Sequence, residues 1–433
     1  MDLVTKIQNL HDFVTNNIHL ADNDFKLRSR SYNTEVMLGF LNAFLEEKIV
    51  YVGEYGLGKT NLCNTISSLA YQIPKESVTN ASIKGNPELT LESVIGRPDL
   101  GQLNQGNESI IWSNFVITQP KVIDELNRIP AGRQSMLLSG MQENLWSHLN
   151  DNFVSPSGSW FATMNYPDAG TRPVSPALMD RFSLMLEAKS PSLNTKRMIR
   201  TGQVKQLKNL QLARAYDTLL MHGQDDIIQL YSNMEGIKDH YTDWVNREFG
   251  LQLIDDLERK EFIKQVKNVE FSQEAHLFLD FIGSEYDSCQ VFGQKRNYEE
   301  CPEGCHFKNY PCYDVDSGLS VRTESSITTF AKALAYLDDS SVQPEHIERI
   351  FPFTLWHKTG VRDEQIHNLE ESERVDPAKL AYFKNAIRDT RNRFDKLKNK
   401  QKTMVGYLVN EDVSNASKMA QQLDHPIFAE YLK

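Results

Sequence analysis

The chain has 433 residues, of which 40% are hydrophobic, and this is enough apolar side chain for the cores of two or three domains. Its formal net charge of −11 argues against nucleic-acid binding through a broad basic surface, although it leaves room for a local basic pore. No run of about 18 apolar residues occurs, so we expect no membrane span. The N-terminus mixes Lys6, Asp12 and Asn16 with apolar residues and lacks the core of a signal peptide, so we expect a cytoplasmic protein.

The first elements predict a strand, a glycine loop and a helix in direct succession. Residues 1–47 have a helical pattern, in which apolar side chains such as Val36, Leu41 and Phe44 recur at helical spacing. The β-branched and aromatic run at 49–52 predicts a strand that leads into the loop at 53–60, and a helical pattern returns over 61–72. A phosphate-binding loop requires this order of elements.

Further elements predict an α/β fold followed by helices. Short apolar runs at 109–112, 121–124 and 159–164 alternate with helical stretches such as 132–142, which indicates a mostly parallel sheet. We expect an α/β nucleotide-binding domain with N-terminal helices at 1–190, an all-helical domain at 191–362 and a charged helical tail at 363–433. The tail carries a basic run at 396–402, which fits a solvated helix or a segment that docks on a partner.

The loop at 53–60 matches the pattern G-x-x-x-x-G-K-[ST] at every fixed position. Backbone N–H groups of such a loop, together with the N-terminus of the next helix, cradle phosphates. Lys59 is expected to reach the β- and γ-phosphates, and the Thr60 hydroxyl to bind Mg²⁺. The alternative is a chance match on a glycine-containing turn. The residues predicted to bind ATP here are Gly53, Glu54, Tyr55, Gly56, Leu57, Gly58, Lys59, Thr60 and Asn61.

An acidic pair, Asp124 and Glu125, ends the predicted strand at 121–124. Beside a phosphate-binding loop, the first carboxylate supports Mg²⁺ and the second polarises the attacking water. The alternative is an exposed acidic turn. Pro120 and Lys121 interrupt the apolar run expected before such a pair, which puts the length of the strand in question but not the carboxylates.

Two more polar residues stand where an ATPase needs them. Asn165 ends the strand at 159–164 and could position the lytic water, or it could simply start the turn before Pro167. Arg181 could stabilise transition-state charge in a neighbouring subunit, or it could form a surface ion pair with Asp180.

Taken together, these motifs resemble the MoxR family of AAA+ ATPases. The resemblance covers roughly residues 25–190 and 265–360. Besides the glycine loop, it rests on the segments 83–87, 94–96, 123–130, 134–138, 141–143, 162–167, 178–182, 320–322, 331–335 and 342–347. Residues 200–265 look like an extra helical insertion in the family's lid domain, and the tail after residue 363 has no counterpart in the family.

The resemblance implies a ring-forming ATPase, usually a hexamer, with ATP bound between subunits. Arg181 would then act in trans as an arginine finger, with Arg172 as a second candidate, and Arg322 would be the sensor arginine of the lid. MoxR proteins act as chaperones that mature other complexes, commonly with a partner that carries a von Willebrand factor A domain. This chain lacks the D-x-S-x-S motif of such a domain, so that partner would be a separate protein.

Four of the five cysteines, Cys289, Cys301, Cys305 and Cys312, fall within one short irregular stretch. Four thiolates can form a closed tetrahedral Zn²⁺ site that holds such a stretch together. The spacing is not that of paired C-x-x-C motifs, so an iron–sulfur cluster, a disulfide or unliganded thiols stay open as alternatives.

The leading hypothesis is therefore an enzyme that hydrolyses Mg-ATP to remodel or mature a protein client. A nucleic-acid-translocating motor of the MCM type is the alternative, and the acidic charge and the lack of a nucleic-acid-binding module count against it. A nucleotide-gated binding module with little turnover is a third hypothesis, but such a module would not need Glu125.

Overall fold

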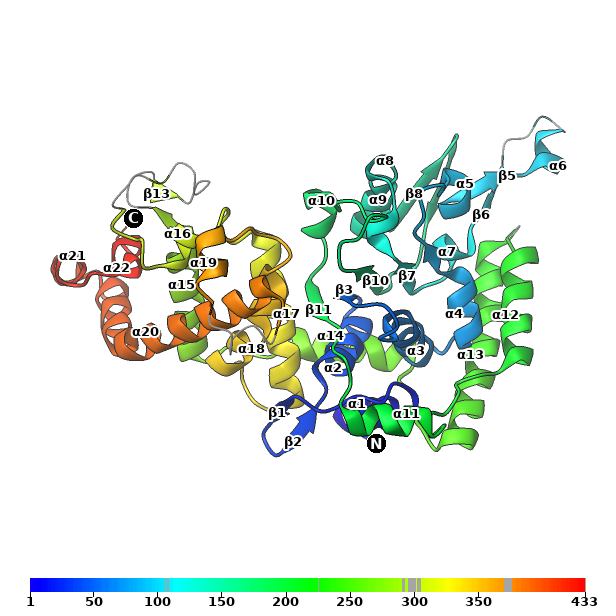
Figure 1. The fold of residues 1–433 in the computed structure, drawn as a ribbon, viewed down its shortest axis with the longest axis horizontal. Helices are drawn as coiled ribbons and strands as arrows, with labels where there is room; N and C mark the ends of the chain where they lie inside the picture. Colours follow the sequence, from blue (N-terminus) through cyan, green and yellow to red (C-terminus); the bar gives the residue numbers. More distant parts are fainter. Residues whose placement is uncertain are drawn as a thin grey trace. The chain divides into compact units, whose positions relative to one another are not determined.

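The computed structural model describes residues 1–104, 106, 109–224, 226–289, 293–294, 301, 305–369 and 376–432. The chain forms two compact units, Met1–Lys264 and Gln265–Lys433 (Figure 1).

A five-stranded parallel sheet forms the centre of the first unit, in the strand order β11-β3-β10-β7-β4. The strands are β3 (Lys48–Gly53), β4 (Ile83–Lys84), β7 (Lys121–Asp124), β10 (Trp160–Asn165) and β11 (Leu184–Glu187). β10 is buried along its whole length, as expected for a strand between two others in a sheet that helices cover. The register pairs Asn165 with Gly53, so the carboxyl ends of β10 and β3 meet at one edge.

The short strand β7 starts with a buried lysine. Lys121 Nζ donates to the carbonyl oxygen of Val116 at 3.1 Å and also to that of Thr118, and burial lowers the pKa of Lys121 to about 7. These carbonyls replace water as partners of the ammonium group, so the lysine does not prevent β7 from forming inside the sheet.

Helices flank the sheet. They include α2 (Thr34–Phe44), α3 (Lys59–Tyr71), α4 (Lys75–Ala81), α12 (Leu210–His222) and α13 (Ile227–Phe249). α12 and α13 lie beside α4 (Figure 1), and Ser77 Oγ on α4 donates to Ala213 O at 3.2 Å. Ser68 on α3 and Tyr241 on α13 share a hydrogen bond of 2.7 Å. The resemblance assigns α12 and α13 to a lid insertion, but in the structure they pack on α3 and α4 of the first unit. The division of the chain into three domains at 1–190, 191–362 and 363–433 stays a prediction.

The N-terminal region departs from the continuous helical pattern predicted for residues 1–47. The helix α1 (Leu3–Phe13) continues into a π-helical turn (Val14–Ile18), and a hairpin of β1 (Phe25–Leu27) and β2 (Arg30–Tyr32) precedes α2. The apolar pattern did not reveal the hairpin because its strands have three residues each. Two further hairpins, β5–β6 (Gly96–Pro98, Ile110–Trp112) and β8–β9 (Leu145–His148, Asp151–Val154), lie outside the main sheet.

The second unit is helical, apart from the two-residue strands β12 (Ser288–Cys289) and β13 (Gly293–Gln294) within the part that the structure describes. Its main helices are α15 (Gln273–Asp287), α17 (Val321–Leu337), α18 (Pro344–Leu355), α20 (Ala378–Val409), α21 (Val413–Gln422) and α22 (Pro426–Glu430). The basic run of the sequence lies on α20, where Lys398 forms an ion pair of 2.6 Å with Glu274 on α15. The chain is therefore an α/β protein with a helical C-terminal part, as predicted.

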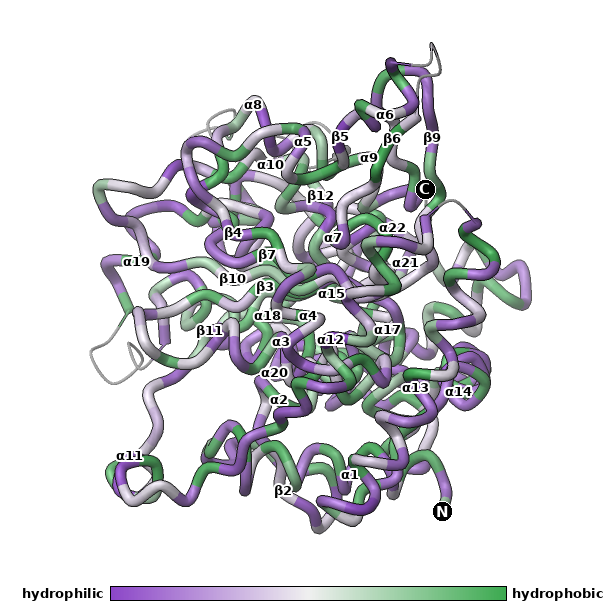
Figure 2. The backbone as a smooth tube through the Cα atoms, turned by 90° about the vertical axis from the view of Figure 1, so that its right-hand side faces the viewer, coloured by the Kyte–Doolittle hydropathy of each residue, from purple (hydrophilic) through white to green (hydrophobic). Residues whose placement is uncertain are grey.

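Hydrophobic and hydrophilic segments alternate along the helices of both units (Figure 2). Within the described residues, no helix is both long enough and apolar enough to cross a membrane.

Candidate functional site

The glycine loop connects β3 to α3, as the sequence predicts. Gly56 and Gly58 both have a φ of +77°, a conformation that residues with a side chain rarely adopt. Gly58 is the N-cap of the 13-residue helix α3, so the loop sits on the positive end of a helix dipole. Apart from its two chain neighbours, no atom of the described residues lies within 4 Å of where a Cβ of Gly56 would stand. A cradle with this backbone geometry fits the phosphates of a nucleotide.

Lys59, the first residue of α3, points back over this loop. Its Nζ donates to Gly53 O at 2.9 Å, to Glu54 O at 2.7 Å and to Asn165 Oδ1 at 3.0 Å. Burial lowers the pKa of Lys59, and the nearby Asp124 and Glu54 carboxylates oppose this effect. The ammonium group is thus positioned at the carboxyl ends of β3 and β10.

Three side-chain oxygens meet at the end of β7. Thr60 Oγ1 donates to Asp124 Oδ1 at 2.5 Å, and Thr163 Oγ1 donates to the same carboxylate oxygen at 2.6 Å. A hydroxyl and a carboxylate are the oxygen donors that Mg²⁺ prefers, together with water and phosphate. The pair predicted to hold the metal, Thr60 and Asp124, therefore has the right chemistry and lies in direct contact. Thr163 was not predicted from the sequence, although its position two residues before Asn165 on the same strand could have indicated it.

Glu125 stands in the left-handed region, with a φ of +55°. Its backbone N–H donates to Thr163 Oγ1 at 3.0 Å, which fixes this conformation. Its Oε1 accepts a hydrogen bond of 2.9 Å from Asn165 Nδ2 and lies 3.2 Å from Arg128 Nε. Gly85 lies against this turn, because a Cβ on Gly85 would stand 2.1 Å from Glu125 O.

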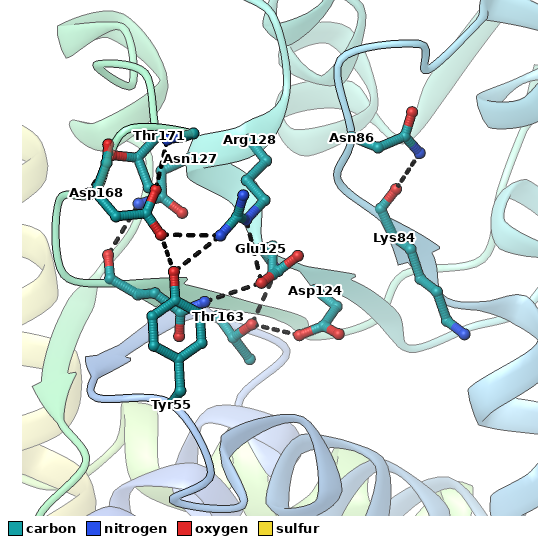
Figure 3. Close-up of polar contacts among 12 residues, drawn as sticks. Tyr55, Lys84, Asn86, Asp124, Glu125, Asn127, Arg128, Thr163, Asp168 and Thr171 are labelled. Carbon is teal, nitrogen blue, oxygen red and sulfur yellow. Dashed lines mark hydrogen bonds and ion pairs between the residues drawn. The ribbon is translucent and has the colours of Figure 1, made fainter.

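A second polar cluster, which the sequence did not predict, links three loops around Arg128 (Figure 3). Arg128 Nη2 donates to Tyr55 OH at 2.8 Å and to Asp168 Oδ2 at 3.0 Å, and Tyr55 OH also donates to Asp168. Tyr55 belongs to the glycine loop, Arg128 to the turn after the acidic pair, and Asp168 to the loop after β10. The cluster connects the glycine loop to Glu125.

A cavity of about 490 Å³ adjoins the glycine loop within the first unit. Gly56, Leu57, Gly58 and Asn61 line one part of it. The segment after the π-helical turn, the start of α2, the chain after β11 and α11 (Leu193–Arg200) supply the rest. The sequence patterns did not reveal this cavity, since its walls come from segments far apart in the chain.

The three arginines suggested for charge stabilisation or sensing belong to other segments of the chain. Arg181 follows α10 (Pro176–Met179); its Nη1 donates to Ala177 O at 2.6 Å and its Nη2 to Gln142 Oε1 at 2.9 Å. Arg172 is exposed on the loop before α10. Arg322 belongs to the second unit, in the first turn of α17. Within the described residues, neither of these two hydrogen bonds of Arg181 joins it to Lys59 or to the acidic pair, and the roles of all three arginines stay predictions.

The cysteines are not gathered into a metal site in the described part of the chain. Cys289, Cys301, Cys305 and Cys312 form no disulfide bond in the part of the chain that the structure describes, and no group of three or more His, Cys, Asp or Glu side chains there could hold a metal ion. Cys63, on α3, is fully buried, and burial raises the pKa of its thiol.

Comparisons with known proteins bear on the fold. No protein-family model matches the chain, and no curated protein does either. Among solved structures, the chain is similar to a "putative ATPase" from Cytophaga hutchinsonii ATCC 33406, with a TM-score of 0.54 and 18% sequence identity. The similarity covers 86% of this chain and 92% of that chain. It supports the assignment of an α/β P-loop fold with a helical C-terminal part.

Proposed function

We propose that this chain is an AAA+ ATPase that hydrolyses Mg-ATP. The observation that carries the proposal is the convergence of Lys59, Asp124 and Glu125 with a threonine hydroxyl and an asparagine amide at one edge of the parallel sheet. The structural similarity to a protein described as an ATPase agrees with it.

Each group has a distinct task in this proposal. The loop N–H groups and Lys59 bind the phosphates, and Thr60 and Asp124 hold Mg²⁺, which when bound would offset negative charge on the phosphate oxygens. The Glu125 carboxylate accepts the proton of the attacking water. The Asn165 amide, already bonded to Glu125, orients that water.

We propose further that the chain is of MoxR type and remodels or matures a protein client. Support for this part comes from the sequence resemblance alone. It entails a ring, usually of six copies, in which Arg181 or Arg172 acts on the site of a neighbouring subunit and Arg322 senses the nucleotide. It also entails a separate partner with a von Willebrand factor A domain. A cytoplasmic location stays a prediction.

The test is the ATPase activity of the purified full-length chain and of Glu125→Gln. We expect Glu125→Gln to bind Mg-ATP but to lower kcat by about 100-fold or more, because it removes a general base. The matched control is Glu143→Gln, which changes an exposed carboxylate at the end of α9 (Met136–Glu143). Normal turnover by Glu125→Gln would show that the base is another residue. Strong stimulation by DNA would favour a translocating motor over a protein-remodelling enzyme.

The zinc site has no support among the described residues, and neither has an iron–sulfur cluster in its place. It stays a prediction of the cysteine spacing, which metal analysis of protein purified without chelator can decide.

A further inference from the structure

The cavity beside the glycine loop contains one buried carboxyl group, that of Glu35 at the start of α2. The residue is 9% exposed. Oε1 accepts a hydrogen bond of 3.0 Å from the backbone N–H of Lys189, and the Glu35 carbonyl oxygen accepts one of 2.9 Å from Tyr51 OH. The described hydrogen bonds of the Glu35 carboxyl group involve Oε1 alone, and Oε2 is not a fully enclosed atom. A carboxyl oxygen of a nearly buried residue that is still accessible, in the wall of a cavity, can bind a polar group of a ligand there.

Other acidic and amide side chains that line the cavity accept hydrogen bonds from nearby backbone and hydroxyl groups. Asp22 accepts hydrogen bonds from Ser192 N at 2.9 Å and from the hydroxyl of Thr195 at 3.0 Å. Asn33 caps α2 by accepting from Val36 N at 3.0 Å. Asp24 accepts from Thr34 N at 2.7 Å and is exposed. Glu35 is therefore the buried acidic group with an acceptor left for a ligand.

The position of the cavity suggests which part of a nucleotide would reach it. Gly56, Gly58 and Asn61 line the cavity and also belong to the loop and helix that would hold the phosphates. The π-helical turn ends at Ile18, and the ring of the next residue, His19, packs against the loop, 3.4 Å from where a Cβ of Gly58 would stand. Burial lowers the pKa of His19 to about 4, so its ring is neutral and suited to pack on a heterocycle. A cavity that begins at the phosphate loop and has these walls fits the base and sugar.

We propose that Glu35 reads the base of the bound nucleotide and selects adenine over guanine. Adenine carries a 6-amino group, which donates hydrogen bonds, whereas guanine carries a 6-oxo group, which accepts them. If position 6 of the purine faces Glu35, the free Oε2 of the ionised carboxylate can accept from the amino group of adenine and would repel the oxo group of guanine. A base that turned its N1–H and 2-amino edge toward Glu35 would instead give a preference for guanine, and the binding ratio distinguishes the two poses. This inference rests on the proposed nucleotide site and adds a residue that determines its specificity.

The surroundings of Glu35 make this selection depend on pH. Burial raises the pKa of Glu35 to about 7. The negative charges of Asp24 and Glu187 also raise this pKa, whereas the hydrogen bond from Lys189 N and the positive charge of Lys189 lower it. The remaining charged or titratable groups that line the cavity are His19, Asp22 and Lys196. Below this pKa, Oε2 carries a proton and can donate to a 6-oxo group. Above it, Oε2 only accepts, so the preference for adenine should grow as the pH rises through about 7.

The experiment measures the binding of Mg-ADP and Mg-GDP to the full-length chain by calorimetry, one pH unit below and one above that pKa. For the wild type we expect ADP to bind about 10-fold more tightly than GDP at the higher pH, and the ratio to shrink at the lower pH. In Glu35→Gln the amide oxygen can keep the Lys189 N–H and turn its NH₂ toward the cavity. We expect this variant to bind ADP about 10-fold more weakly, to favour GDP, and to lose the pH dependence.

Asp24→Asn is the matched control, because it neutralises an exposed carboxylate of the same cavity. It should keep the preference for ADP and move the pH midpoint downward, since the charge of Asp24 raises the pKa of Glu35. If the ratio of the ADP and GDP affinities of the wild type does not change with pH, the inference is overturned, even if Glu35→Gln fails to fold. A folded Glu35→Gln variant that keeps the wild-type ratio of these affinities also overturns it. If the wild type binds neither nucleotide, the proposed function fails together with the inference.

Discussion

The side-chain amide of Asn165 donates a hydrogen bond of 2.9 Å to Glu125 Oε1. Its Oδ1 accepts one of 3.0 Å from Lys59 Nζ, so a single amide connects the candidate base to the candidate phosphate-binding cation. Asn165 is the last residue of the buried strand β10, which pairs with both β3 and β7. The position of the amide between the two charges follows from this strand order.

Asn165→Ala should lower kcat for ATP by about 100-fold, because the amide orients the base and the water, and should leave nucleotide affinity within about threefold, because Lys59 keeps its hydrogen bonds to Gly53 O and Glu54 O. Steady-state kinetics and a binding titration check this. Asn64→Ala is the matched control, since Asn64 is also a buried asparagine of this unit but bonds to Thr79 at 3.1 Å. Unchanged turnover in Asn165→Ala would remove Asn165 from the proposed site.

Thr163→Val should lower kcat by about 10-fold, because it removes the acceptor of the Glu125 N–H and a donor to Asp124 without changing the shape of the side chain. Thr163→Ser, which keeps the hydroxyl, should restore most of the activity. Both variants are compared by kcat and by thermal unfolding. Equal losses in the two variants would contradict a role for the hydroxyl.

Arg128→Ala should lower kcat by about 10-fold while changing the free energy of unfolding by about 1 kcal/mol or less. The stability effect is small because Arg128 and Asp168 are 25% and 33% exposed, and such ion pairs contribute little. The activity effect is larger because the guanidinium fork links Tyr55, Asp168 and Glu125. Arg128→Lys cannot bridge all three and should not restore activity. If unfolding is strongly affected and kcat is not, the cluster is only structural.

Glu285→Gln should destabilise the second unit by about 2–4 kcal/mol at neutral pH, because it breaks a buried ion pair. Glu285, on α15, is 0% exposed and accepts from Arg393 Nε at 2.6 Å and from Thr390 Oγ1 at 2.5 Å, both on α20. His425, before α22, adds a contact of 3.1 Å. The control Glu274→Gln breaks a partly exposed pair between the same two helices and should cost about 0.5 kcal/mol.

The pH dependence of this effect has a definite sign. Burial by itself raises the pKa of Glu285, but the hydrogen bonds from Arg393, His425 and Thr390 outweigh it and lower the pKa below its ordinary value of 4.5. The stabilisation is therefore fully present above that value and is lost as the pH falls through the lower pKa of the folded state. Denaturant unfolding of wild type and Glu285→Gln should converge in acid. A difference that grows in acid would contradict this account.

The sequence by itself determined the groups whose position depends on local order along the chain. Gly58, Lys59 and Thr60 follow an apolar strand and precede a helical pattern. This order along the chain predicts both the phosphate-binding loop and the start of α3. Asp124 and Asn165 were predicted from their places at strand ends, and parallel strands bring such ends to one edge of a sheet. Their roles in catalysis stay proposals.

Only the tertiary structure placed the partners that come from distant parts of the chain. Thr163 contacts the acidic pair, and Tyr55 contacts Asp168, because the strand order sets β3, β10 and β7 side by side. Glu35 and His19 reach one cavity because a π-helical turn and a short hairpin intervene where the apolar pattern predicted continuous helix. Periodicity reports which face of an element is buried, but it does not report which other element covers that face, and such contacts decided the composition of this site.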